Sequence, residues 1–194
     1  MKRAFLLTLA LVVSSAISFV IAQPDGDNDA HTINFTIPEV TLLDIEASAS
    51  TTITLGVTAP TEAGLPLDFS SATNSDLWLN YTSIKATSTT VRKITVGLDV
   101  APPTNTTLKV SATDPSGTSG FGNQGSTFGT NVTLGTTAVD LITGIGSCYT
   151  EDGVNKGSNL TYTLSLTSAS SYNDLYSLNQ DEPVVVTYTL EDAP

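Results

Sequence analysis

The sequence is short of the residues on which most catalytic and covalent chemistry depends. Its 194 residues include one cysteine, one histidine, one tryptophan and one methionine, and only 13% of them are charged. A single cysteine excludes a disulfide within the chain. A catalytic triad needs a histidine base, and the only one, His31, adjoins a stretch that we expect to be flexible. The sequence therefore predicts no enzyme, and no catalytic, cofactor-binding or metal-ligating residue.

Basic residues are also scarce. The chain has 7 Lys and Arg against 19 Asp and Glu, a formal charge of −12. Nucleic acids and anionic membrane surfaces would repel such a chain, so neither is expected as a partner. Convincing helical periodicity is missing too, whereas Ser, Thr and Gly are abundant. This composition is typical of an all-β protein.

Long hydrophobic runs are confined to the beginning of the sequence. A basic start, Met1-Lys2-Arg3, is followed by the apolar stretch 4–13 and by small residues before Gln23. This order predicts a signal peptide over residues 1–22, cleaved after Ala22. An uncleaved membrane anchor is the alternative, which three interrupting serines disfavour.

The rest of the chain lacks any apolar run long enough to cross a bilayer, so we expect no membrane insertion of the mature protein. Residues 23–30 predict a flexible, acidic leader, and residues 31–194 a single domain. The protein is expected to be secreted, to the cell surface or the extracellular space, with a periplasmic location also open.

Alternating apolar side chains mark most of the predicted strands. Leu77, Leu79 and Tyr81 share one face of their segment, and Leu160 and Tyr162 share one face of theirs. Such segments recur every 8 to 15 residues or so, which predicts about nine or ten strands. We expect an Ig-like antiparallel β-sandwich with Greek-key connections.

Two strand pairings are also expected. The run Thr-Tyr-Thr-Leu occurs in both 159–166 and 184–190, which suggests neighbouring antiparallel strands of one sheet. Segments 91–99 and 107–112 are close in sequence and are predicted to form a hairpin with a long turn. Separately, the apolar residues of the segment Thr51 to Val57 alternate, so this segment is predicted as a strand.

Residues 31–37 form an alternating segment just after the leader. Ile33, Phe35 and Ile37 face one way, and Pro38 ends the predicted strand or leaves it at a sheet edge. The segment is either the first strand of its own sandwich or a donor strand that completes the sheet of a neighbouring subunit.

Aromatic side chains offer a second candidate site. Trp78 lies on the opposite face of its strand from the leucines, where it could stack on a sugar together with Tyr149, Tyr172 or Tyr176, which are expected in loops. The alternative is that Trp78 is a packing residue.

Several of these features together resemble a known family. The signal peptide, the segment 31–37, the strand Asn80-Tyr81-Thr82, the hairpin from 93–96 to 108–110 and the terminal strand 186–190 are similar to bacterial secreted β-sandwiches of the pilin-like kind, which include chaperone–usher subunits and spore-coat-U-like domains. The cysteine pair common in such pilins is missing here. The resemblance implies a structural or adhesive surface protein, such as a pilus or fibre-like subunit.

Such a subunit would assemble by strand exchange through residues 31–37, with copies of itself or other surface subunits as partners. The alternative function is an extracellular carbohydrate-binding module that binds a glycan through Trp78 and the loop tyrosines.

Overall fold

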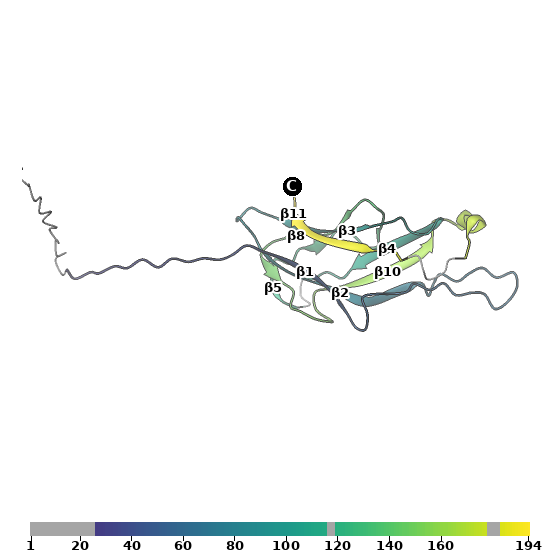
Figure 1. Ribbon diagram of the computed structural model, residues 1–194, viewed down its shortest axis with the longest axis horizontal. Helices are drawn as coiled ribbons and strands as arrows, with labels where there is room; N and C mark the ends of the chain where they lie inside the picture. The colour runs from purple at the N-terminus through teal and green to yellow at the C-terminus, as the bar shows by residue number, and fades with distance from the viewer. Residues whose placement is uncertain (1–25, 116–118, 178–182) are drawn as a thin grey trace, which may run out of the picture. The chain divides into compact units, whose positions relative to one another are not determined.

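The computed structural model describes residues 26–115, 119–177 and 183–194 (Figure 1). The predicted signal peptide, residues 1–22, and the first residues of the predicted leader lie outside this part of the chain. The described residues belong to two units, one that reaches to Thr36 and one from Ile37 to Pro194. The first unit contains no helix or strand in residues 26–36, and the second contains every element named below.

The second unit is an antiparallel β-sandwich, as the alternation of apolar residues predicted. Its described residues form eleven strands and one short 3₁₀-helix, where the sequence predicted about nine or ten strands. The elements are β1 (Val40–Ala47), β2 (Thr73–Ile84), β3 (Arg92–Leu98), β4 (Thr106–Ala112), β5 (Phe121–Gly122), β6 (Ser126–Thr127), β7 (Val132–Thr133), β8 (Val139–Ile145), β9 (Cys148–Tyr149), β10 (Ser158–Leu166), η1 (Ala169–Asp174) and β11 (Val186–Asp192).

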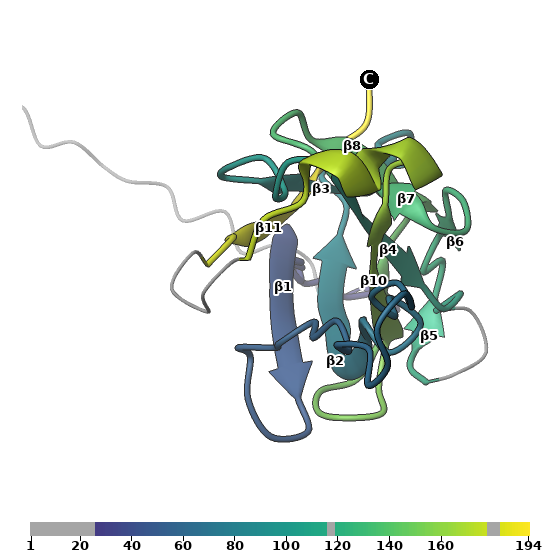
Figure 2. The same cartoon turned by 90° about the vertical axis from the view of Figure 1, so that its right-hand side faces the viewer.

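The strands form two sheets, one on each side of the core. The seven-stranded sheet contains β1, β2, β4, β5, β7, β9 and β10, and the four-stranded sheet has the order β11-β3-β8-β6. Figures 1 and 2 show β1, β2 and β10 in one layer and β11, β3 and β8 in the other. β2 pairs with β1 along one edge and with β10 and β9 along the other, so it is the central strand of the larger sheet.

Two predicted pairings are wrong, because in each case the two strands belong to different sheets. β10 and β11 belong to different sheets, and so do β3 and β4. β10 pairs instead with β2 and β4, and β11 pairs with β3. Residues 99–105 therefore bridge the two layers rather than turn within one.

The core fills the space between the layers with the side chains that the alternation pointed inward. Leu77, Leu79 and Tyr81 of β2 are buried, as predicted. They pack against buried residues of four other strands, Ile94, Val96, Val110, Leu141 and Leu160. Burial of such side chains, each contributing roughly 1.5–3 kcal/mol, is the main stabilising term of the fold.

Residues 51–57 form no strand, which corrects the strand predicted there. No strand is assigned to them, and the next backbone pairing is an isolated bridge between Thr58 and Asp68. Ile53, Leu55 and Val57 are nevertheless half-buried, and the first two pack against the core. The alternation therefore predicted which side chains face inward, although it could not supply a neighbouring strand.

Candidate functional site

The segment 31–37 does not form the strand that its alternation predicted. No strand is assigned before Val40 among the residues described. The three apolar side chains are exposed, Ile33 by 61%, Phe35 by 86% and Ile37 by 83%. In a half-buried strand such a set of alternating apolar side chains would be covered, whereas here all three are exposed.

Both sheets have an open edge in the part of the chain that the structure describes. β1 pairs only with β2, and β11 pairs only with β3. The outer edge of each strand therefore offers backbone N–H and C=O groups that have no ladder partner. Such an edge can accept an added strand, whose backbone groups would complete the ladder.

The two open edges are joined at one end by Arg92, the first residue of β3. The side chain of Arg92 is 2% exposed. Its guanidinium forms ion pairs with Glu39, just before β1, and with Asp192 at the end of β11, and it donates to the carbonyl oxygen of Val40 at 2.6 Å. One buried cation thus ties the beginning of β1 to the end of β11.

The aromatic residues predicted to bind a sugar are divided between two places. Trp78 is half-buried on the outer face of β2, where it pairs in register with Glu46 and Asn159. Tyr149 lies on β9 opposite Thr82, four residues further along the same face, or roughly 13 Å away. Its ring packs against Phe121 with the centroids 6.1 Å apart.

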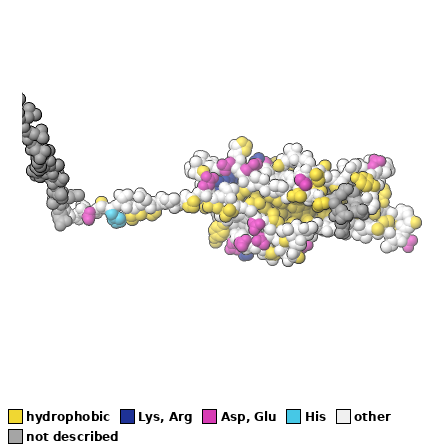
Figure 3. All heavy atoms as spheres, in the orientation of Figure 1, with side chains coloured by type: hydrophobic (Ala, Val, Ile, Leu, Met, Phe, Trp, Pro, Cys, Tyr) yellow, Lys and Arg dark blue, Asp and Glu magenta, His cyan; other side chains and the backbone are white. Residues whose placement is uncertain are grey.

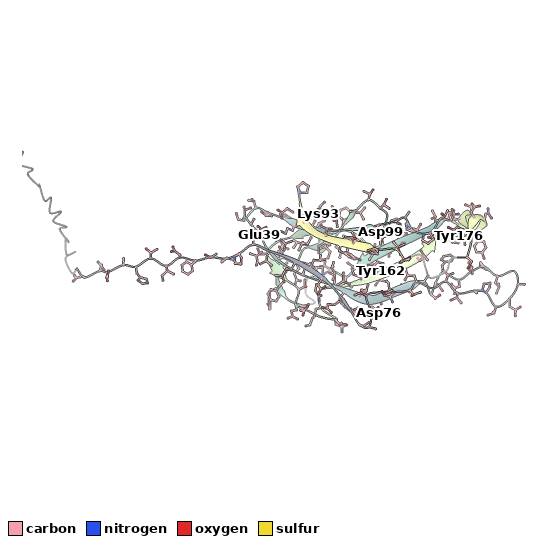
Figure 4. The ribbon with its side chains drawn as sticks, viewed as in Figure 1. Glu39, Asp76, Lys93, Asp99, Tyr162 and Tyr176 are labelled. Atoms are coloured by element: carbon pink, nitrogen blue, oxygen red, sulfur yellow. The ribbon has the colours of Figure 1, made fainter. Side chains whose placement is uncertain are left out.

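The other two tyrosines lie at a different hollow, Tyr172 within η1 and Tyr176 just after its end. Figure 4 shows Tyr176 at the η1 end of the sandwich, whereas Glu39 marks the opposite end. Tyr172 and Tyr176 line a mainly apolar cleft of about 680 Å³, whose other walls include Leu55, Phe69 and Leu164. The four predicted aromatics therefore do not form one platform, and only Tyr172 and Tyr176 share a cleft.

A cluster of carboxylates was not singled out by the sequence. Asp44 and Glu46 of β1 and Asp152, in the loop between β9 and β10, can each place one oxygen so that all three lie within 4.8 Å of one another. Figure 3 shows that acidic side chains gather in groups with few basic ones among them. Spacing along β1 could have indicated the first two residues, but the loop that brings Asp152 to them could not be predicted.

The fold and its open edges define the protein as an antiparallel β-sandwich with an exposed apolar segment before its first strand. Comparison of the chain with models of protein families, with curated proteins and with solved structures found no match. The similarity to pilin-like subunits thus stays a prediction. Within the described residues, no helix has the length and the apolar character required to cross a membrane.

Proposed function

We propose that the protein is a secreted structural or adhesive surface subunit whose copies associate through residues 31–37. The observation that carries this proposal is the exposure of Ile33, Phe35 and Ile37 in a segment that has no strand of its own. Secretion is supported by the signal peptide that the sequence predicts over residues 1–22.

Strand addition would use both the open sheet edges and the exposed apolar segment. An incoming strand gains main-chain hydrogen bonds along an open edge, while its alternate side chains fill apolar positions of the acceptor. β1 and β11 supply open edges, and residues 31–37 supply three apolar side chains at alternate positions. The segment is long enough to cover most of either edge strand, since β1 has 8 residues and β11 has 7.

Charge favours residues 31–37, rather than another copy of β1 or β11, as the strand that adds to an open edge. β1 carries Asp44 and Glu46, and β11 carries Glu191 and Asp192, so two identical edges would repel each other. Residues 32–37 carry no acidic side chain. A donor segment without acidic side chains can therefore approach an edge strand that would repel another copy of the same edge strand.

Light scattering after size exclusion tests the proposal on the mature chain, residues 23–194. We expect concentration-dependent association, which substitution of the apolar face (Ile33→Asp, Phe35→Asp and Ile37→Asp together) abolishes while the circular dichroism of the sandwich stays unchanged. The matched control places the same three charges on the polar face, with Thr32→Asp, Asn34→Asp and Thr36→Asp. A parent chain that is monomeric throughout, or equal behaviour of the two variants, contradicts the proposal.

A second function, glycan binding, is favoured by the cleft beside η1. Tyr172 and Tyr176 line it together with Thr54, Thr106 and Ser177, and an aromatic wall with polar residues nearby suits a sugar ring. A glycan array with Tyr176→Ala and Trp78→Ala compares the two aromatic sites. Loss of binding in Tyr176→Ala alone supports glycan binding in this cleft. Equal binding by the parent chain and both variants contradicts glycan binding through these aromatic residues.

A further inference from the structure

Two edge strands, β1 and β11, leave one side of the core partly uncovered. β1 faces the core with Leu43, Ile45 and Ala47, which pack against the core residues but are only half-buried. β11 faces the core with Val186 and Tyr188, which are half-buried as well. The residues opposite them in register on β2 and β3 are all buried: Leu77, Leu79, Tyr81, Val96 and Leu98. The cover is therefore missing on the outer side of the two edge strands.

β1 and β11 border the same side of the sandwich. They lie next to each other in Figures 1 and 2, and the side chain of Arg92 joins Val40, at the beginning of β1, to Asp192, at the end of β11. Figure 3 shows a band of hydrophobic side chains along the body of the sandwich, between the two layers. We call this side, bordered by β1 and β11, the open side.

The backbone of β11 directs unused hydrogen-bonding groups toward the open side. Val185 accepts a backbone hydrogen bond at 3.1 Å from the residue just after β3, and Ala193 donates one at 2.8 Å to the residue just before β3. Bonded pairs alternate along an antiparallel ladder, so every second residue from Val185 to Ala193 is bonded toward β3. The residues between them direct their N–H and C=O groups outward, where they meet no partner among the described residues: Val186, Tyr188 and Leu190.

β11 also lacks the features that normally protect an exposed sheet edge. Charged side chains, proline and β-bulges keep such edges from pairing with another chain. Residues 184–190 contain no charged residue and no proline, and β11 pairs with β3 along its whole length without a shift in register. Glu191 and Asp192, at the end of the strand, form ion pairs with Lys93 and Arg92. β1, in contrast, carries two acidic side chains along its middle, so β11 is the less protected edge.

The apolar segment before β1 matches this edge in length and in pattern. Residues 31–37 and residues 184–190 are stretches of equal length. In an added strand, the residues opposite the core-facing positions of β11 face the core themselves. Ile33, Phe35 and Ile37 alternate, so all three side chains enter the open side together, while the polar residues between them stay in solvent.

We propose, on the basis of the association through residues 31–37 put forward above, that this segment adds to the open edge of β11 in a second copy of the chain and covers its open side. The outward N–H and C=O groups of β11 then gain ladder partners. The donor's apolar side chains cover Val186 and Tyr188, which are otherwise half-buried. Residues 32–37 contain no acidic side chain, which limits repulsion by an acceptor with a formal charge of −12.

The short connection to β1 favours a second copy over the segment's own sandwich. Only Pro38 and Glu39 separate the segment from β1. To run along the open side of its own sandwich, the chain would have to reverse direction within these two residues. A two-residue reversal between antiparallel strands favours positive φ angles, which proline cannot adopt. Glu39 is also held by its ion pair with Arg92, so the segment is better placed to reach another molecule.

Disulfide trapping between single-cysteine variants of the mature chain tests which strand accepts the segment. Thr36→Cys or Asn34→Cys places a thiol on the polar face of the donor, and Thr187→Cys places one on the exposed face of β11. Opposite residues on neighbouring strands have Cα atoms about 4.5–5.5 Å apart, a distance that a disulfide spans. Asp44→Cys, also exposed and in the middle of β1, is the matched control. The native Cys148 is 4% exposed and does not compete.

Each donor variant is mixed with each acceptor variant under mild oxidation, and linked dimers are identified by their mass. We expect dimers that join a donor variant to Thr187→Cys, and loss of this product when Asp44→Cys takes its place. Linkage to Asp44→Cys instead, or to neither variant although the parent chain associates, overturns the choice of β11 and leaves association through residues 31–37 standing. A parent chain that stays monomeric overturns both.

A double variant, Thr36→Cys with Thr187→Cys, distinguishes a second copy from the segment's own sandwich. At low protein concentration we expect its thiols to stay free, and at high concentration to link separate chains. A disulfide that closes within one chain at low concentration overturns the second copy as the acceptor. Both substituted residues are exposed, and circular dichroism of each variant checks that the sandwich is intact.

Discussion

The hydroxyl groups of Tyr162 and Tyr188 are hydrogen-bonded to each other across the core, from one sheet of the sandwich to the other. Tyr162 is buried on β10 and Tyr188 half-buried on β11, and Figure 4 shows Tyr162 within the body of the sandwich. Each hydroxyl thus gives the other a polar partner in an otherwise apolar layer.

Removal of one of these hydroxyls should lower the free energy of unfolding by more than the hydrogen bond itself contributes. Tyr188→Phe leaves the Tyr162 hydroxyl buried without its partner, and we expect a loss of about 1–2 kcal/mol in the free energy of unfolding. The double variant Tyr162→Phe with Tyr188→Phe should lose less than the sum of the two single variants, because no orphaned hydroxyl remains. Urea denaturation of the four proteins checks this, and strict additivity would contradict it.

Alkaline pH should destabilise the protein through buried groups that stay protonated when it is folded. Burial raises the pKa of Cys148 from 9.0 to about 11, and it raises the pKa of Tyr162 and of Tyr188 above the ordinary 10.0. The unfolded chain releases these protons first, so stability is complete below pH 9 and falls as the pH rises toward 11.

Each group that is ionised only in the unfolded state contributes a slope of about −1.4 kcal/mol per pH unit. The free energy of unfolding, measured from pH 8 to pH 11 by urea titration, should therefore decline with increasing steepness. Cys148→Ala removes the earliest of these groups, so the decline in this variant should begin closer to pH 10. An unchanged profile in the variant would show that Cys148 does not contribute.

Arg92 should matter far more than its neighbour Lys93, although both form two ion pairs with carboxylates. Arg92→Met leaves the carbonyl oxygens of Val40 and Ile84 without their donor, and we expect a loss of about 2–4 kcal/mol. Lys93→Met should lose much less, since ion pairs near the surface contribute little. Denaturation of both variants measures the difference, and equal losses would contradict the role given to Arg92.

Gly157 should tolerate no side chain, because the loop before β10 presses against β2. A Cβ at this position would lie 2.2 Å from the carbonyl oxygen of Leu79, and its φ of +61° is left-handed. Gly144, with a φ of +74° and open space around it, is the matched control. Gly144→Ala should cost about 1–2 kcal/mol from backbone conformation alone. Gly157→Ala should cost clearly more, as thermal unfolding of the two variants can show.

The sequence predicted the faces of the strands well and their neighbours poorly. The alternation of Leu77, Leu79 and Tyr81 identified buried side chains, because a period of two is a local property of an extended chain. The pairing of β10 with β2 and β4, rather than with β11, depends on contacts across the whole fold. Similar sequences in β10 and β11 suggested neighbours, but they are alike because both strands face the same core.

The candidate sites differ in the same way: features set by local sequence could be predicted, whereas those set by distant contacts could not. Residues 31–37 could be selected from local alternation alone, although alternation could not predict that they form no strand and that Ile33, Phe35 and Ile37 are exposed. Asp152 could not be connected with Asp44, since they lie on segments that only β2 brings together. The distribution of Trp78 and the three tyrosines over separate places depended likewise on how β9 and η1 are located.

The crossing of the chain between the sheets also determines the order in which the molecule can fold. Arg92 and Asp192 are 100 residues apart in the chain, and β3 and β11 pair along their whole length. One edge of the smaller sheet therefore stays open until nearly the whole domain has been synthesised. Contacts between such distant segments slow folding, because a long loop must close before they form. The smaller sheet can therefore be completed only after β11, the last strand of the domain, has been synthesised.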